Sequence, residues 1–197
     1  MIKVTRNPQE TQQKILESAL EEFAEHGYHG ARIDRIVKNA GVNKRMVYHY
    51  FKDKDGLFTA LMKTELDNIQ EVTKTEPTED FFELANHWLK NIDQTKNYFR
   101  LSLSSDCVES EGVSLLEQEQ QRGFDFSKQI YADLIKKEGL SDEVDPAYFL
   151  LAMISLTSLP MVLPTMSKLV TGKNYDSEEF RHEYERVIRV LFPIKPN

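Results

Sequence analysis

Residues 33–54 read IDRIVKNAGVNKRMVYHYFKDK, and this segment predicts two short helices joined by a tight turn. Apolar residues recur in its first part at the spacing of one helix face, from Ile33 to Ala40. Gly41 stands where that helix should stop, because glycine adopts the left-handed backbone of a helix end at the lowest cost. Asn43 can then cap a second helix by accepting backbone N–H bonds.

The second helix of this segment has an inward and an outward side. Val47, Tyr50 and Phe51 recur at helical spacing and form the inward side. The outward side consists of Lys44, Arg45, Met46, Tyr48 and His49. This pattern predicts a helix-turn-helix whose second helix enters the major groove of double-stranded DNA.

The distribution of charge supports this interpretation. Between Arg32 and Lys54 there are seven basic residues and two acidic ones. Residues 1–56 carry 10 basic and 8 acidic residues, whereas residues 57–197 carry 15 and 24, a net charge of -9. A basic head on an acidic body would confine DNA contact to one end of the protein. Charge alone leaves open a second interpretation, a solvated charged face on an ordinary helical protein.

Residues 11–66 resemble the N-terminal domain of TetR-family transcriptional regulators. The resemblance rests on five blocks in the family's order and spacing: ILESA (15–19), FAEHGY (23–28), AGVNK (40–44), VYHYF (47–51) and KDKDGL (52–57). It implies an all-α protein with a three-helix DNA-binding head (residues 1–56) and a larger helical domain for ligand binding and dimerisation (residues 57–197). The chain departs from the family at Arg32, where Ser or Thr is frequent, and at Arg45 and Met46, where small residues are frequent. These departures concern the DNA sequence that is read, not the fold.

The rest of the chain also predicts helices throughout. Asn7 caps a first helix that Gly27 ends, and Asp53 caps a fourth helix that is long enough to enter the body. The first helix has an acidic outer face, formed by Glu17, Glu21, Glu22 and Glu25. Further helices are expected at residues 78–93, 95–107, 112–138, 145–170 and 177–192. Pro160 and Pro164 should kink the helix at 145–170.

Two features near the C-terminus predict a second copy of the chain. Residues 148–163 are apolar nearly all round, which is typical of a helix buried on every side. The last helix carries an apolar stripe, formed by Phe180, Tyr184, Val187, Ile188 and Leu191. The resemblance implies that residues 145–170 and 177–192 pair across a two-fold axis as a four-helix bundle. We therefore expect a homodimer that binds a near-palindromic operator.

Composition excludes several other classes of protein. The 197 residues are 40% hydrophobic and 29% charged, as in ordinary globular proteins. The single cysteine, Cys107, excludes an intramolecular disulfide and fits a reducing cytosol. The first residues lack the apolar run of a signal peptide, and no segment offers about 20 apolar residues for a membrane span. We therefore expect a cytoplasmic protein with no membrane partner.

The sequence also lacks the common motifs of catalysis. It has no nucleophile elbow, no His-Glu-x-x-His, no phosphate-binding glycine loop and no paired cysteines. Its five histidines do not have the spacing of metal ligands. These absences predict a protein that is not an enzyme and that has no metal and no cofactor.

The body of the chain is rich in aromatic and methionine side chains that could line an apolar pocket. The candidate ligand contacts are Trp88, Phe99, Phe124, Tyr131 and Met153. For each of them alone, plain core packing is the favoured alternative. The aromatic residues favour an apolar or aromatic effector, and the net charge of -9 on the body adds a mild preference for a cationic one.

These observations together predict a ligand-responsive DNA-binding transcriptional regulator, with repression as the favoured mode. Arg45 is the candidate contact for guanine, and Met46 is the candidate for a thymine methyl group. The candidate phosphate contacts are Tyr48, Lys52 and Lys54. The alternative from another class is a helical small-molecule-binding or scaffold protein whose head has lost specific DNA binding.

Overall fold

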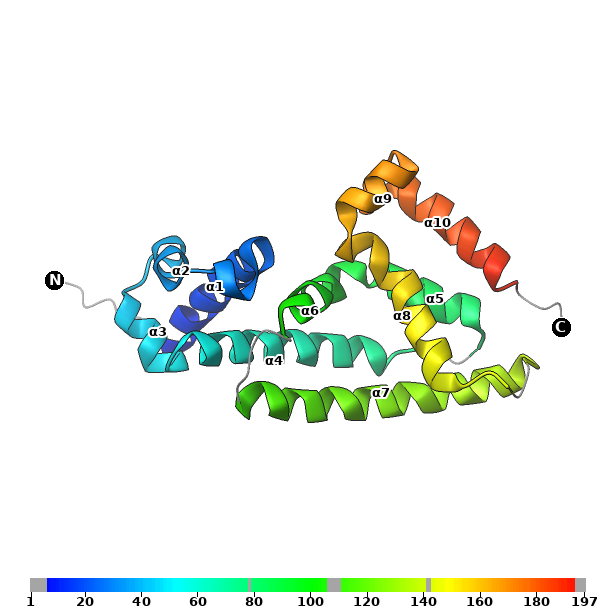
Figure 1. Cartoon of the computed structure of the whole chain (residues 1–197), viewed down its shortest axis with the longest axis horizontal. Helices are drawn as coiled ribbons and strands as arrows, with labels where there is room; N and C mark the ends of the chain where they lie inside the picture. Colours follow the sequence, from blue (N-terminus) through cyan, green and yellow to red (C-terminus); the bar gives the residue numbers. More distant parts are fainter. Residues whose placement is uncertain (1–6, 78, 106–110, 141–142, 194–197) are drawn as a thin grey trace. The chain divides into compact units, whose positions relative to one another are not determined.

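The computed structural model describes residues 7–77, 79–105, 111–140 and 143–193 (Figure 1). These described residues form ten α-helices and no strand, which confirms the all-α fold. Cys107, the single cysteine, lies outside the described residues.

The chain divides into two compact units. The first unit comprises Met1–Asp67 and Arg100–Glu119, and the second comprises Asn68–Phe99 and Gln120–Asn197. The helices α4, α6 and α7 contribute residues to both units. The sequence analysis instead divides the chain by function, with a DNA-binding head that ends at residue 56 and a ligand-binding body that follows. That functional boundary stays a prediction.

The first unit begins with α1 (Pro8–Gly30), α2 (Ile33–Ala40), α3 (Lys44–Phe51) and α4 (Lys54–Thr73). The side chain of Asn7 caps α1 by accepting the N–H of Gln9 at 3.1 Å, as expected. The backbone of Gly27 is not helical, with φ 66° and ψ 175°. The predicted end of the first helix is therefore a kink, after which α1 continues for three residues.

The caps of α2 and α3 follow the prediction. Gly41 takes the left-handed conformation, with φ 65° and ψ 32°, and the N–H of Val42 bonds to the carbonyl of Val37 at 3.1 Å. The side chain of Asn43 accepts the N–H of Arg45 at 2.9 Å at the start of α3. These bonds fix the turn of the helix-turn-helix.

The junction between α3 and α4 brings two backbone segments unusually close. Lys52 ends α3 with φ 70°, an uncommon value for a residue with a side chain. Asp53 then caps α4, because its Oδ1 accepts the N–H of Gly56 at 2.7 Å. A Cβ atom on Gly56 would lie 1.9 Å from the carbonyl oxygen of Phe51, so the junction admits only glycine at this position.

Apolar side chains from α1 to α4 form the core of the head. Ile15, Ile36 and Val47 are fully buried, one from each of the first three helices. The ring of Phe23 meets the ring of Phe58 edge to face, with centroids 5.1 Å apart. This core holds α3 with Val47 inward and its polar side toward solvent.

The remaining helices are α5 (Phe81–Lys90), α6 (Ile92–Ser105), α7 (Glu111–Lys137), α8 (Pro146–Val162), α9 (Pro164–Thr171) and α10 (Glu178–Leu191). The second unit has its own core, in which Phe81, Tyr131, Leu134 and Ile188 are nearly or fully buried. These residues come from α5, α7 and α10, so the core joins helices that are far apart in sequence.

The helix expected at residues 145–170 is two helices, which corrects the prediction. α8 and α9 meet at a bend of 88°. The break falls at Leu163 (φ -119°, ψ 64°), directly before Pro164, because a residue before proline is disfavoured in the helical region. Pro160 instead lies inside α8. Among the described residues, no single helix is long and apolar enough to cross a membrane, and only the bent pair α8 and α9 passes that test jointly.

Candidate functional site

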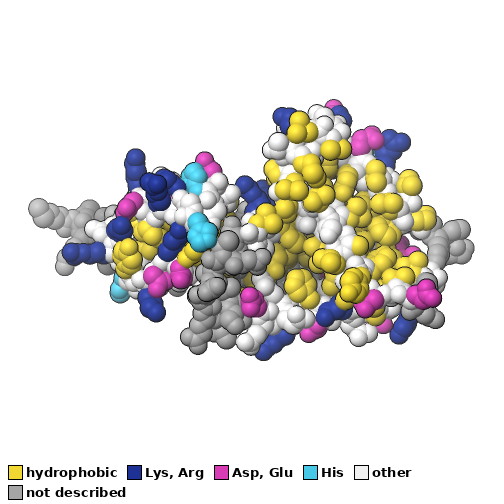
Figure 2. All heavy atoms as spheres, in the orientation of Figure 1, with side chains coloured by type: hydrophobic (Ala, Val, Ile, Leu, Met, Phe, Trp, Pro, Cys, Tyr) yellow, Lys and Arg dark blue, Asp and Glu magenta, His cyan; other side chains and the backbone are white. Residues whose placement is uncertain are grey.

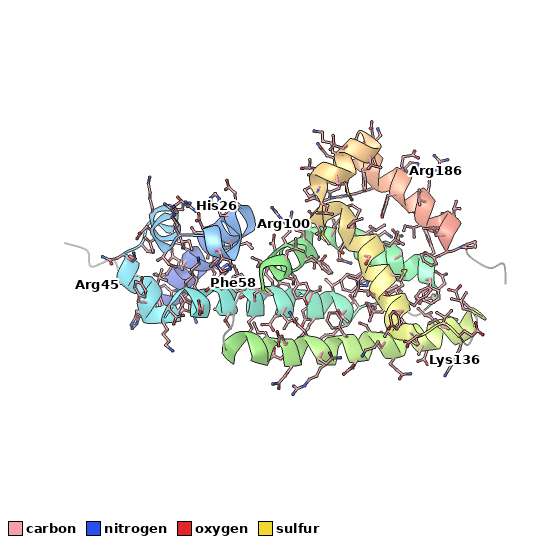
Figure 3. All side chains as sticks on the ribbon, viewed as in Figure 1. His26, Arg45, Phe58, Arg100, Lys136 and Arg186 are labelled. Atoms are coloured by element: carbon pink, nitrogen blue, oxygen red, sulfur yellow. The ribbon has the colours of Figure 1, made fainter. Side chains whose placement is uncertain are left out.

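The outer side of α3 presents the side chains that the sequence assigned to DNA. Lys44, Arg45, Tyr48 and His49 are exposed, and Met46 is half-buried. Arg45 stands out, because within the described part of the chain its guanidinium has no hydrogen bond or ion pair. Its side chain is labelled on α3 in Figure 3. Arg45 is therefore open to a bidentate partner.

Lys44 is already paired on the same surface. Its Nζ lies 2.7 Å from Oδ1 of Asp34, an exposed contact between α3 and α2. The hydrogen bond to Asp34 raises the pKa of Lys44, so the ammonium stays charged. Because exposed pairs of this kind are weak, Lys44 can exchange Asp34 for another acceptor at little cost.

A buried carboxylate orients the helix-turn-helix against α1. Glu22 is 5% exposed, and its Oε1 accepts the backbone N–H of Arg32 at 2.8 Å and the Nε–H of Arg35 at 2.7 Å. The hydrogen bond from Arg35 is the main reason that the pKa of Glu22 is lowered. The expectation that Glu22 belongs to the acidic outer face of α1 was therefore wrong: it holds the start of α2.

Lys54, a candidate phosphate contact, is directed to another partner. Its Nζ donates to the carbonyl oxygen of Ala31 at 2.8 Å and lies 4.6 Å from the ring centroid of Tyr28. Burial lowers the pKa of Lys54. The hydroxyl of Tyr28 donates to the carboxylate of Asp55, and burial together with Asp55 raises the pKa of Tyr28 to about 12. Lys54 thus braces the end of α1 against the start of α4. Lys52, another candidate phosphate contact, is exposed to solvent.

The five candidate ligand contacts have different environments in the second unit. Tyr131 and Met153 are buried in one core cluster, at 1% and 2% exposure. Phe99 is half-buried and its ring meets Tyr98 edge to face at 5.3 Å. Phe124 is exposed on α7 and Trp88 is half-buried on α5. Core packing accounts for Tyr131 and Met153 without a ligand.

A buried carboxylate that the sequence analysis missed lies beside two of these candidates. Glu76, in the connection between α4 and α5, is 9% exposed, and its Oε1 accepts the indole N–H of Trp88 at 2.8 Å. Its Oε2 has no hydrogen-bond partner among the described residues. Burial raises the pKa of Glu76 to about 7, against the opposing effects of Trp88 and Ser127. Burial and the nearby Glu76 also raise the pKa of Tyr131.

The second unit exposes an extensive apolar surface on its last three helices, which we call the α8–α10 surface. It consists of Tyr148, Leu151, Leu159, Leu163, Met166, Leu169, Val170, Val187, Val190 and Leu191. Figure 2 shows hydrophobic side chains gathered over this unit. Monomeric proteins rarely expose so many large apolar side chains together, so this surface is a candidate interface.

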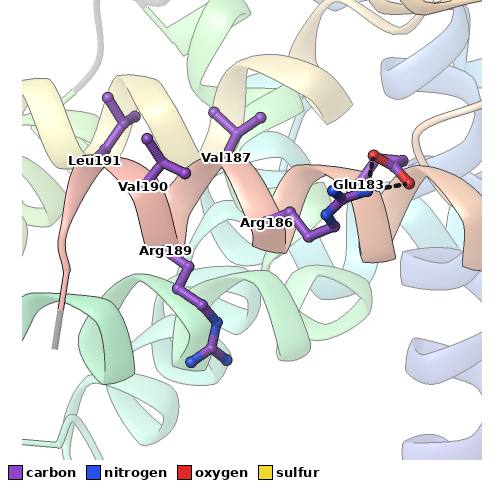
Figure 4. Close-up of a pocket in the computed structure, with 6 residues that line it drawn as sticks. All are labelled: Glu183, Arg186, Val187, Arg189, Val190 and Leu191. Atoms are coloured by element: carbon purple, nitrogen blue, oxygen red, sulfur yellow. Dashed lines mark hydrogen bonds and ion pairs between the residues drawn. The ribbon is translucent and has the colours of Figure 1, made fainter.

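On α10 the predicted apolar stripe is divided between two sides. Phe180 and Ile188 are buried at 6% and 0% exposure, whereas Val187 and Leu191 are 49% and 54% exposed. Val187, Val190 and Leu191 project together from one side of the helix in Figure 4. They line a shallow depression of ≈ 460 Å³, next to the ion pair of Arg186 and Glu183.

Known proteins match this arrangement. The model of a family described as "Bacterial regulatory proteins, tetR family" matches residues 15–61. The HTH-type transcriptional repressor SCO4008 of Streptomyces coelicolor is 27% identical over 176 residues, which cover 85% of this chain and 86% of that protein. The HTH-type transcriptional repressor AcnR of Corynebacterium glutamicum is 40% identical over 65 residues, 33% of this chain and 35% of AcnR.

The fold of the whole chain also has solved counterparts. AibR, crystallised in complex with isovaleryl coenzyme A and operator DNA, superposes with a TM-score of 0.75 at 17% identity, over 94% of this chain and all of that one (100%). At this identity the likeness concerns the fold. Residues 15–61 of this chain therefore match bacterial regulatory proteins of the tetR family, the chain is similar to SCO4008 along most of its length, and it shares its fold with AibR.

Proposed function

We propose that this protein is a homodimeric transcriptional repressor that leaves its operator when a small molecule binds to its second unit. The observation that carries the proposal is the exposed, basic outer side of α3 on a head of the tetR type. SCO4008 and AcnR, which are similar in sequence, are both described as transcriptional repressors. AibR, which is similar in fold, was crystallised with an acyl coenzyme A and operator DNA together.

In this proposal α3 lies in the major groove. Arg45 donates two hydrogen bonds to O6 and N7 of a guanine, for which its unpaired guanidinium is suited. Met46 contacts a thymine methyl group, while Lys44 and His49 lie on the same groove-facing side. The phosphate contacts are the exposed Tyr48 and Lys52, and in the dimer each head reads one half-site. We assign Lys54 to bracing the head, because its ammonium is bound to Ala31.

The α8–α10 surface is the proposed dimer interface. Val190 and Leu169 are 80% and 82% exposed, and burying such side chains against a second copy stabilises association by about 1.5–3 kcal/mol each. A two-fold axis would bring the same surface of both copies together. The two heads would then face half-sites about one helical turn apart, roughly 34–36 Å.

Binding of the full-length protein to fragments of its source genome tests the proposal. We expect the selected fragments to share a near-palindrome, and we expect an effector to weaken operator binding by the same factor by which operator weakens effector binding. Nearly complete release, from about 99:1 to 1:99, requires a difference of about 5.5 kcal/mol in effector affinity between the two states. Equal affinity for all fragments would favour the alternative, a small-molecule-binding or scaffold protein without specific DNA binding.

A further inference from the structure

Glu76 is an unusual residue for the interior of a helical unit. Its carboxylate is 9% exposed, and the described residues supply one hydrogen-bond donor, the indole of Trp88. The second oxygen, Oε2, has no hydrogen-bond partner among the described residues, and the hydroxyl of Ser127 lies close enough to lower the pKa of Glu76. A buried, partly satisfied carboxylate is costly, so an additional donor at Oε2 would be strongly favoured.

The groups around this oxygen define what could bind there. Trp88 comes from α5, and Ser127 and Tyr131 come from α7. None of the described side chains places a positive charge near the carboxylate. The free oxygen is therefore an acceptor in a mostly aromatic setting, which suits a cationic or N–H-bearing group attached to an apolar body.

One face of α7 connects this oxygen with the surface. Phe124, Ser127 and Tyr131 follow one another at intervals of three and four residues, so they share a side of the helix. Their exposure falls along the helix, from 39% at Phe124 to 6% at Ser127 and 1% at Tyr131. The same side of α7 therefore carries one exposed aromatic residue, Phe124, and the two buried residues beside Glu76.

We propose that Glu76 is the polar recognition group of the effector site, and that the effector joins a protonated amine to an apolar or aromatic body. The inference rests on the proposed function, because it names the ligand class of the site through which the repressor is released. The amine donates to Oε2, Trp88 continues to donate to Oε1, and the aromatic side chains of α5 and α7 contact the body of the ligand.

The proposal makes binding depend on pH. The amine pairs with the ionised form of Glu76, and burial raises the pKa of that carboxyl to about 7. Tyr131, the titratable neighbour from α7, stays neutral because burial and Glu76 raise its pKa too. Amine affinity should therefore fall about tenfold between about pH 8 and about pH 6, because the ionised fraction of Glu76 falls by that factor.

The chain contains a reporter for this site, since Trp88 is its single tryptophan. The emission of Trp88 in the full-length protein would be followed during titration with three probes of one shape: phenylbutylamine, phenylbutanol and phenylbutyrate. We expect the amine to bind about tenfold or more tightly than the alcohol at about pH 8, a difference of about 1.4 kcal/mol. Glu76→Gln should abolish that preference, while Glu79→Gln, which removes an exposed charge from the same connection, should retain it.

The outcomes separate the inference from the proposed function. Equal affinity for the amine and the alcohol, no response to the amine at millimolar concentration, or an amine preference that survives Glu76→Gln would each overturn the inference. If Glu76→Gln does not fold, the wild-type protein decides, because a pH-independent amine affinity contradicts the proposal. Operator binding is measured separately with labelled DNA. If the protein shows no specific DNA binding in that assay, the proposed function fails, whatever the amine titration shows.

Discussion

Lys54 and Lys52 lie two positions apart, and their side chains have different environments: Lys54 is bonded to Ala31, whereas Lys52 is exposed. Replacing Lys54 by Met keeps the apolar stem but removes the ammonium that donates to Ala31 at 2.8 Å and lies over Tyr28. A hydrogen bond from a charged group contributes about 1.5–3 kcal/mol, and a partly exposed cation–π contact adds about 0.5–1 kcal/mol. Because Lys54 is only partly buried, we expect Lys54→Met to lower the free energy of unfolding by about 1–2 kcal/mol.

The assay compares stability with the salt dependence of DNA binding. Lys52→Met is the matched control, since Lys52 is exposed and is a proposed phosphate contact. We expect Lys52→Met to leave urea unfolding unchanged and to reduce the slope of log affinity against log salt by about one unit. Lys54→Met should do the reverse, destabilising the head while the slope stays that of the wild type.

One result would refute this division of roles. If Lys54→Met unfolds at the wild-type urea concentration and loses about one unit of salt slope, then Lys54 leaves Ala31 to bind a phosphate. The original expectation from the sequence would then hold, and the bond to Ala31 would belong only to the free protein.

Three further predictions concern other parts of the molecule. Arg45→Ala should cost about 1–3 kcal/mol of operator affinity and relax the preference for one base in each half-site, as measured by competition with altered operators; an equal loss on random DNA would make Arg45 a phosphate contact instead. Val190→Glu should give folded monomers in sedimentation, because Val190 is 80% exposed in the single chain; an undisturbed dimer would place the interface elsewhere. Because the pKa of Glu76 is raised from 4.5 to about 7, its contribution to stability is present below about pH 4.5 and is lost as pH rises through about 7. That loss amounts to about 3 kcal/mol, so Glu76→Gln should flatten urea-unfolding stability between about pH 5 and about pH 8, and an unchanged pH dependence would contradict the raised pKa.

The parts of the head that could be predicted depend on interactions within a few residues. Gly41 ends α2 with a left-handed backbone, and the side chains of Asn43 and Asp53 each accept a backbone N–H bond in their own turn. These residue types therefore predict where α2 ends and where α3 and α4 begin. The outward side of α3 follows from the helical repeat for the same reason. The break before Pro164 was anticipated as a kink, but its 88° angle depends on packing that no local pattern describes.

The parts that could not be predicted depend on partners far away in sequence. In the sequence Glu22 is one acid among several on α1, and its partner Arg35 lies 13 residues later on another helix. Glu76 follows the end of α4 and carries no motif, yet it meets Trp88 from α5 and lies near Tyr131 from α7. A carboxylate in an aromatic setting is recognised only when the fold has brought these helices together.

The close contact at Gly56 limits which amino acids the protein can accept at this position. In a library of all single substitutions, position 56 should tolerate almost no replacement, because any side chain meets the carbonyl of Phe51 and forces α4 away from α3. Gly123 is its counterpart within a helix, with nothing within 4 Å of an added Cβ, and Gly123→Ala should even stabilise α7 by about 0.5–1 kcal/mol. Substitution should therefore be tolerated at Gly123 and rejected at Gly56, although the sequence alone does not distinguish the two glycines. A homologue in which position 56 is no longer glycine should also have lost operator binding.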